Sequence, residues 1–140
     1  MTVLRMGSGA PWEAVVGYSR VVVAGGSAWV AGTTATVDGS VLHRGDMGAQ
    51  AAVAFSVLVS ALESAGFSAA DVVRTRMYVT DTSRWEEVGR VHGEVFGGVR
   101  PATAMIGVAA LLDPDMLVEV EADAVRVSGE MGTAVRGAGS

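Results

Sequence analysis

The longest apolar stretch of the chain predicts a helix that is largely buried. Residues 47–66 are mostly hydrophobic, and Gly66 is placed to end a helix in a left-handed cap. Four of the polar residues that interrupt this stretch share one helical face: Ser56, Ser60, Glu63 and Ser64. The stretch is long enough to cross a membrane, but the polar face indicates an amphipathic core helix instead.

A second amphipathic helix is predicted after residue 83. Ser83 and Glu86 have the spacing of a capping box, so they predict the start of this helix. Its apolar stripe recurs at helical intervals: Trp85, Val88, His92, Val95 and Phe96. We expect the aromatic side chains of this stripe to lie in the core.

Strand patterns fill the rest of the chain. Two β-branched runs flank Gly25-Gly26, and Asp38-Gly39 marks a second, shorter hairpin. Residues 71–80 alternate between apolar and polar positions, with Val73, Thr75, Met77 and Val79 on the apolar side. Beyond Pro101 we expect a strand, a turn at Asp113-Pro114, and a returning strand over residues 116–127.

The order of elements predicts an α+β fold in which two helices cover one face of a sheet. The second face would then be open and rich in apolar groups. Self-association is the simplest way to cover it.

Composition narrows the class of protein. With 140 residues, half of them hydrophobic, we expect a single domain over residues 1–127 and a flexible tail over 128–140. The net charge of −5 argues against a nucleic-acid partner. Neither cysteine nor lysine is present, which excludes thiolate and Schiff-base catalysis.

The sequence lacks the patterns typical of an exported protein and of a metal site. The N-terminus has no signal-peptide pattern, so we expect a cytoplasmic protein without a membrane segment. His43 and His92 are far apart in sequence and have no ligand-spaced neighbours, so we expect no metal site.

Three acids alternate on one side of the last strand: Glu119, Glu121 and Asp123. Such a row is typical of a solvated strand face, because charged residues are seldom buried unless paired. The alternative is that one carboxylate lines a cleft, where partial burial raises its pKa and suits it to proton transfer or to holding water.

Three segments of the chain resemble the reactive-intermediate deaminase family, also called Rid or YjgF-like. They are "GYSRVVVAGGSAWVAGTTA", "GAQAAVAFSVLVSALESAGFSAADVVRTRMYVTD" and "VFGGVRPATAMIGVAALLDPDMLVEVEADAV". The most specific elements are Pro-Ala followed by a strand, the V-E-V-E-A alternation, and Gln50 at the start of the first helix. The resemblance covers about residues 15–127.

The resemblance implies a chorismate-mutase-like fold assembled as a homotrimeric barrel, with ligand clefts between subunits. In the family's deaminases, water hydrolyses small imines or enamines to a keto acid and ammonia without a cofactor. An arginine holds the substrate carboxylate, and a glutamate of the last strand positions the water.

Carried over by position, the glutamate is Glu119, while Gly32 and Thr33 flank the cleft and Tyr18 lies at its edge. The arginine position is occupied by Thr103, which would donate one neutral hydrogen bond where a guanidinium donates two charged ones. We therefore expect weak binding of ordinary amino-acid imines.

Four further residues are carried over as lining the pocket. Met105 and Gly89 replace a cysteine and an asparagine that are common in the family, which makes the pocket more apolar. His92 stands where an aromatic residue is usual, as a packed histidine or as an acid–base group. Arg100 either substitutes for the missing arginine or caps a helix end at the surface.

These residues leave three hypotheses. The first is a trimeric enzyme that hydrolyses or otherwise transforms a small imine or enamine lacking the usual carboxylate, with Glu119 as its catalytic residue. The second is a non-catalytic ligand-binding or regulatory trimer. The third is a tailoring or cyclising enzyme of a specialised biosynthetic pathway.

Overall fold

The computed structural model describes residues 2–126, which form a six-stranded mixed sheet, a small hairpin and two long helices. The expected tail over 128–140 lies outside the described residues. The elements follow the chain in this order: β1 (Val3–Met6), η1 (Glu13–Gly17, a π-helical turn), β2 (Val21–Ala24), β3 (Ser27–Thr33), β4 (Thr36–Val37), β5 (Ser40–Val41), α1 (Met47–Ser64), η2 (Ala69–Asp71), β6 (Val72–Val79), η3 (Thr82–Arg84), α2 (Trp85–Phe96), β7 (Ala102–Gly107) and β8 (Val118–Val125).

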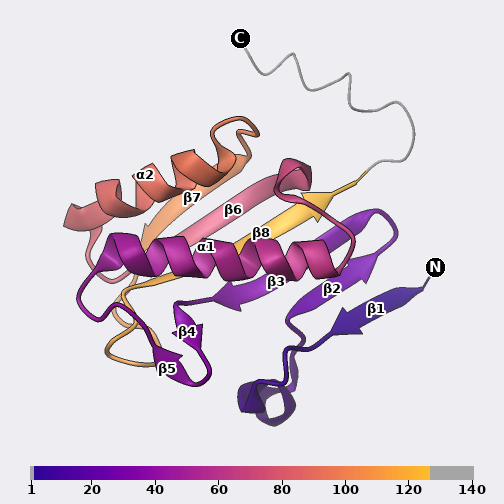
Figure 1. Cartoon of the computed structure of the whole chain (residues 1–140), viewed down its shortest axis with the longest axis horizontal. Coiled ribbons are helices and arrows are strands. Elements are labelled where there is room, and N and C mark those ends of the chain that lie inside the picture. Colours follow the sequence, from indigo (N-terminus) through magenta and orange to yellow (C-terminus); the bar gives the residue numbers. More distant parts are fainter. Residues whose placement is uncertain (1, 127–140) are drawn as a thin grey trace.

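The sheet has the strand order β1-β2-β3-β8-β6-β7 (Figure 1). Only β6 and β7 pair in parallel, and every other neighbouring pair is antiparallel. The last strand, β8, therefore lies in the middle of the sheet, between β3 and β6. Its central position fixes the side chains of residues 118–125 more firmly than an edge position would.

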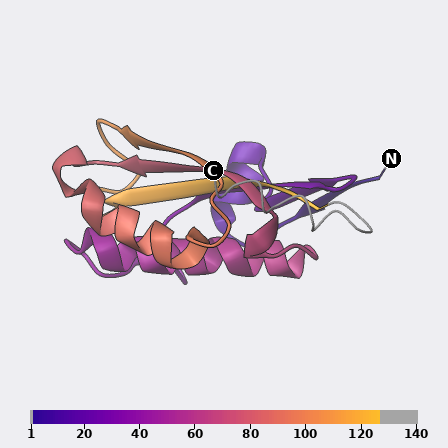
Figure 2. The same cartoon turned by 90° about the horizontal axis from the view of Figure 1, so that it is seen from above.

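Both helices lie on the same side of the sheet, which confirms the predicted α+β layering (Figure 2). The core fills the space between them and the sheet, and its largest fully buried hydrophobic side chains include Phe55, Phe96, Met47, Leu58, Leu62, Val79 and Val120. By length and composition α1 would pass as a membrane span, but its buried face packs on the sheet, as in the core helix of a folded domain.

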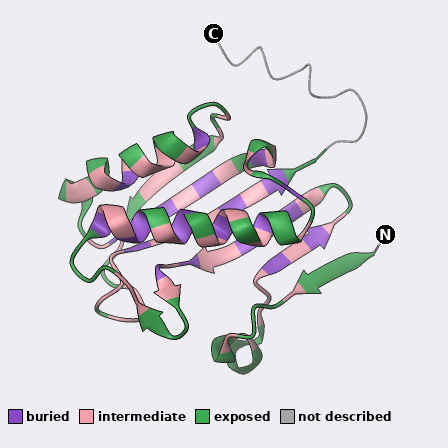
Figure 3. Ribbon diagram, in the orientation of Figure 1, coloured by how far each residue is buried: buried purple, intermediate pink, exposed green. Residues whose placement is uncertain are grey.

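The first helix forms as its sequence predicts. Asp46 caps its N-terminus by accepting a hydrogen bond from the backbone of Ala49 at 3.0 Å, and Gly66 takes the expected left-handed conformation with φ +87°. Its solvent side is exposed (Figure 3), and the four polar residues predicted there are all exposed: Ser56, Ser60, Glu63 and Ser64.

The start of the second helix differs from the prediction. Ser83 lies in the preceding turn η3, where Asp81 accepts from its backbone N–H at 3.0 Å, and α2 begins without a side-chain cap. Trp85 is 54% exposed, whereas Phe96 is buried. The expectation of a core tryptophan is therefore wrong, because the Trp85 ring lies against Gly89 of its own helix while Val88 and Phe96 fill the core.

Three features of the sheet depart from the sequence pattern. The edge strand β1 has no alternation of its own and exists through pairing with β2. Val73 is 46% exposed because a register shift between Val72 and Arg74 turns Val72 inward in its place. The strand β6 also separates β7 from β8, so the two strands joined by the Asp113-Pro114 turn are not neighbours.

The uncovered face of the sheet is less apolar than expected. Trp29 and Ile106 are exposed on it at its two sides, but polar side chains of β6 and β8 occupy its middle. These are Arg74, Arg76, Tyr78, Glu119, Glu121 and Asp123.

Candidate functional site

Glu119 lies on the uncovered face of the sheet, near the N-terminal end of β8. It is partly buried and pairs in register with Tyr78 of β6. On its other side it meets Gly32, where a Cβ would come within 2.9 Å of the carboxyl carbon and collide with an oxygen. The carboxylate therefore fits against bare backbone, and a side chain at position 32 would have to displace it.

A β-bulge shapes the backbone beside Glu119. The register between β3 and β8 shifts between Val30 and Thr33, so Gly32 lies in the irregular segment. Arg20 holds this segment, because its Nη1 donates to the Gly32 carbonyl at 2.9 Å and to Thr33 Oγ1 at 2.7 Å. The Tyr18 ring lies 5.9 Å from the Arg20 guanidinium carbon, at cation–π range.

The electrostatic surroundings of Glu119 favour its protonated form. Burial raises the pKa of its carboxyl above the ordinary value for glutamate, and the negative charge of Glu121 raises it further. Arg20 acts in the opposite direction and lowers that pKa. The net shift of the pKa is upward, the direction that suits a carboxyl group to accept and return a proton.

The other two acids of the row are paired. Tyr78 donates its hydroxyl hydrogen to Glu121 at 2.6 Å, a bond that raises the pKa of the tyrosine. Arg76 lies 3.5 Å from Glu121 and 4.0 Å from Asp123. Glu119 makes neither a hydrogen bond nor an ion pair with any residue between 2 and 126, so it alone of the three acids has both oxygens available.

A second polar cluster lies on the opposite, helix-covered face, at the β7 edge. The buried Thr75 hydroxyl lies 2.8 Å from His92 Nε2 and 2.9 Å from Thr103 Oγ1. Thr103 also donates to the carbonyl of Pro101 at 3.0 Å. A core hydroxyl needs such partners, since an unbonded one would be costly to bury.

His92 is packed as an aromatic side chain. Its ring centroid lies 5.6 Å from that of Phe55 and 4.9 Å from that of Phe96. Burial lowers its pKa below the ordinary value for histidine, so the ring is neutral at pH 7. These contacts favour the packed histidine over the acid–base group.

The two clusters cannot meet within one chain. Glu119 is level with Tyr78, whereas Thr103 is level with Thr75, which lies three residues earlier in the same strand. Because successive side chains of a strand alternate, Glu119 and Thr103 point to opposite faces. They are also separated by the full width of β6.

Comparison with known proteins identifies the family to which this chain belongs. Residues 8–126 match the family model Ribonuc_L-PSP, described as Endoribonuclease L-PSP. The chain belongs to the YjgF/L-PSP family.

Relatives agree over nearly the whole chain. An uncharacterized protein of Streptomyces coelicolor is 40% identical over 89% of this chain and 92% of its own, and a RutC family protein of Pyrococcus horikoshii is 30% identical over 78% and 86%. The crystal structure of Rv2704 from Mycobacterium tuberculosis, a member of the YjgF/YER057c/UK114 family, matches with a TM-score of 0.82 and 48% identity, covering 89% of this chain and all of that one.

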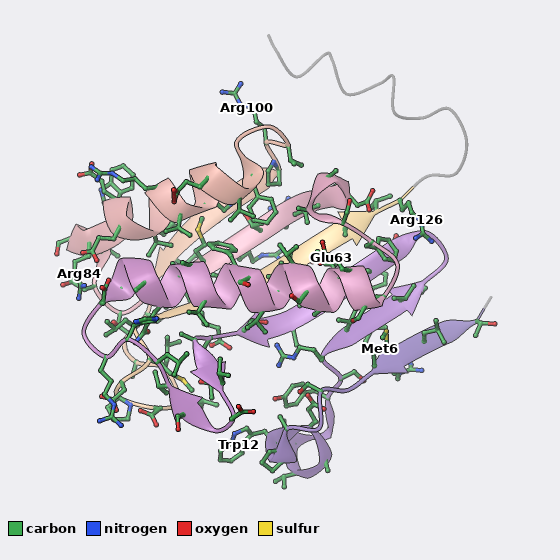
Figure 4. All side chains as sticks on the ribbon, viewed as in Figure 1. Met6, Trp12, Glu63, Arg84, Arg100 and Arg126 are labelled. Carbon is green, nitrogen blue, oxygen red and sulfur yellow. The ribbon has the colours of Figure 1, made fainter. Side chains whose placement is uncertain are left out.

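The remaining expected site residues of this YjgF-family chain divide between the two clusters. Tyr18 joins the Glu119 side through Arg20, while Met105 follows Thr103 on β7 and packs against the core. The exposed Trp85 ring lies on Gly89, where an added Cβ would be 3.4 Å from the indole. Arg100 projects from the α2–β7 loop away from the rest of the fold (Figure 4).

One hollow in the surface coincides with neither cluster. It measures about 590 Å³ and lies beside Tyr18, between the η1 turn and strands β2 and β3, with Trp29 and Arg5 in its wall. It includes neither Glu119 nor Thr103. Over residues 2–126 no three acidic or histidine side chains gather in a metal-binding arrangement.

Sequence reasoning missed Arg20 and Thr75. A lone charge directly before an apolar strand was the available signal for Arg20, but only the bulge shows what it holds. Thr75 alternates with apolar residues and so points inward, and a buried hydroxyl implies a polar partner. That partner, His92, lies on another element and could not be named from the strand alone.

Proposed function

We propose that this protein is a cofactor-independent hydrolase of small imines or enamines. The single observation that supports the proposal is Glu119, a partly buried carboxylate with a raised pKa and no partner among the described residues. Its two neighbouring acids are paired with Arg76 and Tyr78, which leaves Glu119 as the one acid of the row free to act on a ligand.

The proposed reaction needs one carboxylate and one water molecule. Glu119 takes a proton from water while the water oxygen bonds to the imine carbon, and the C=N electron pair moves to nitrogen. The protonated Glu119 then returns this proton to the nitrogen, which gives a carbinolamine. In a second transfer Glu119 takes the hydroxyl proton of the carbinolamine and delivers it to the nitrogen while the C–N bond breaks, and the products are a carbonyl compound and ammonia. A carboxyl whose pKa lies above the ordinary range is suited to both transfers.

The proposed active site is shared between copies of the chain. The two clusters face opposite sides of one sheet, so a ligand touching both must lie between two subunits. A homotrimer, as the resemblance implies, would place the Glu119 face of one copy against the β7 edge of the next and would also cover Trp29 and Ile106.

Ribonuclease chemistry, which the family description names, is less well supported. The net charge is −5, and a polynucleotide needs a run of cationic side chains along its phosphates. Two of the arginines on or near the sheet are engaged by protein groups: Arg20 by carbonyls and Arg76 by carboxylates.

The test is hydrolysis of freshly generated imines with and without a carboxylate, followed through loss of the imine. Glu119→Gln should lower kcat/KM by about 10²- to 10⁴-fold, the usual worth of a general base. Asp123→Asn removes an acid from the same face and should change the rate little. Equal rates for wild type and Glu119→Gln on every imine would refute the proposal.

A non-catalytic ligand-binding protein is the second candidate. It is favoured by Thr103, which stands where the resemblance implies a cationic anchor for the ligand. Binding of a keto acid or amide without turnover of any imine would support it.

A further inference from the structure

The hydroxyl hydrogen of Thr103 is already committed inside the protein. Its Oγ1 has three neighbours: the Pro101 carbonyl at 3.0 Å, Thr75 Oγ1 at 2.9 Å and His92 Nε2 at 3.5 Å. A carbonyl oxygen can only accept, so the Thr103 hydrogen goes to Pro101. Toward Thr75, the Thr103 oxygen must then be the acceptor.

The position of the Thr103 hydrogen also determines which groups donate in the other hydrogen bonds of the cluster. The Thr75 hydroxyl donates to Thr103 and therefore accepts from His92, which makes Nε2 the protonated nitrogen of the neutral ring. If His92 carried its hydrogen on Nδ1, Thr75 would donate to the ring and Thr103 would donate to Thr75. The Thr103 hydrogen would again be used, and the Pro101 carbonyl would lose its bond.

In either arrangement Thr103 offers a ligand only a lone pair. The residue is exposed, so its oxygen can be reached from outside the chain. The nearest arginine along the sequence, Arg100, projects away from the fold and brings no positive charge to it (Figure 4).

We propose that Thr103 selects a ligand whose nearby end donates a hydrogen bond and carries no negative charge, such as a primary amide or a hydroxyl. This inference rests on the proposed cleft and replaces the expectation that Thr103 donates to the ligand. A carboxylate presents only lone pairs and would meet the lone pair of Thr103 without a bond. One neutral hydrogen bond made or lost corresponds to about a five- to tenfold difference in affinity.

A matched pair of small ligands tests this selection. Pyruvamide and pyruvate have the same skeleton and differ in whether the end group donates. We expect wild type to bind pyruvamide about tenfold more tightly, measured by NMR titration of the backbone amide signals of β7. Binding of pyruvate as tightly as pyruvamide, or binding of neither at tens of millimolar, would overturn the inference.

Two variants separate the lone pair from the shape of the side chain. Thr103→Val is isosteric but has no oxygen, so the preference should fall to about twofold or less. Thr103→Ser keeps the oxygen and should keep the preference. An unchanged preference in Thr103→Val would also overturn the inference, and near-wild-type urea denaturation of both variants would establish that they remain folded.

Failure of the inference can be told from failure of the proposed hydrolase. Glu119→Gln should lower turnover by about 10²- to 10⁴-fold, whereas Thr103→Val should remove the pyruvamide preference while Glu119 stays in place. If the protein hydrolyses imines but prefers pyruvate, the proposed hydrolase stands and the inference about Thr103 is refuted. If it prefers pyruvamide but hydrolyses no imine, the inference about Thr103 stands and the proposed hydrolase is refuted.

Discussion

At the scale of single residues, the reactivity of Glu119 depends on which of its neighbours are charged. Burial and Glu121 both raise its pKa, whereas Arg20 lowers it. Glu121 is held in place by the Tyr78 hydroxyl and by Arg76, so its charge stays close to Glu119. Within the row of acids, the Glu121 carboxylate therefore raises the pKa of the Glu119 carboxyl.

This arrangement predicts the pH dependence of hydrolysis. The proposed base must be ionised, so kcat/KM should fall as the pH falls through the pKa of Glu119, above the ordinary range for glutamate. Glu121→Gln removes a negative neighbour, lowers the pKa of Glu119 and should move this limb to lower pH. The measurement is a pH profile of kcat/KM for both proteins. Asp123→Asn is the control, and an unmoved limb in Glu121→Gln would contradict the assignment.

Gly32 makes a second prediction at the residue scale. A methyl group at this position collides with the Glu119 carboxylate, so Gly32→Ala should displace the proposed base and reduce kcat by at least about tenfold. Gly93→Ala is a matched control, because a Cβ there meets nothing within 4 Å and favours the helix. Full activity of Gly32→Ala, measured by imine loss, would show that the close fit is irrelevant.

At the scale of elements, a buried glutamine joins α1 to the start of β8. Gln50 is fully buried and donates to the carbonyls of Asp115 at 2.8 Å and His43 at 3.2 Å. Its side-chain oxygen accepts from the Leu117 backbone at 2.9 Å, two residues before Glu119. The side chain therefore fixes the entry of the chain into the central strand.

Gln50→Leu should accordingly destabilise the fold. It removes three hydrogen bonds and leaves the Leu117 N–H and the Asp115 carbonyl unpaired, which together should cost about 2–4 kcal/mol of unfolding free energy. Urea denaturation measures this cost, with Ser56→Ala on the exposed side of the same helix as a control expected to change it by less than about 0.5 kcal/mol. A loss no greater than that of the control would mean that the Gln50 bonds contribute nothing.

At the scale of the whole molecule, the proposed site requires two copies of the chain. The helices cover one face of the sheet, while Glu119 lies on the uncovered face and Thr103 on the covered one. Neither cluster alone contains both a base and a group to orient a ligand. Self-association would therefore complete the site as well as cover exposed apolar surface.

A mixing experiment tests the shared site. The double variant Thr103→Arg/Glu119→Gln has a carboxylate anchor but no base, and wild type has a base but no anchor, so each alone should hydrolyse carboxylate-bearing imines poorly. Co-assembly at equal amounts should combine base and anchor at about a quarter of the sites, because each half comes from the correct chain half of the time. Activity appearing on mixing would support the shared site. No gain after verified subunit exchange would mean that each site is built from one chain.

Local pattern was sufficient for most elements and for the family. The apolar run with its serine face predicted α1, and paired turn residues predicted the two hairpins. The alternation of the final acids placed them on one face, and the resemblance to the family selected Glu119 among them. These features depend on residues near one another in sequence, whose periodicity and turn chemistry act on the backbone directly.

The tertiary structure decided which strands and side chains meet. The pairing of β1 with β2, the position of β6 between β7 and β8, the bulge held by Arg20, and the network of Thr75, His92 and Thr103 all join distant segments. Every strand offers the same backbone N–H and C=O groups, so these groups do not specify which strand lies beside it. The alternation of apolar and polar residues shows which side chains face inward but leaves the neighbouring strand undetermined. The sequence by itself determined the elements and the candidate base. Only packing determined that the Glu119 and Thr103 clusters face opposite sides of the sheet and that the Thr103 hydroxyl donates its hydrogen to a group within the protein.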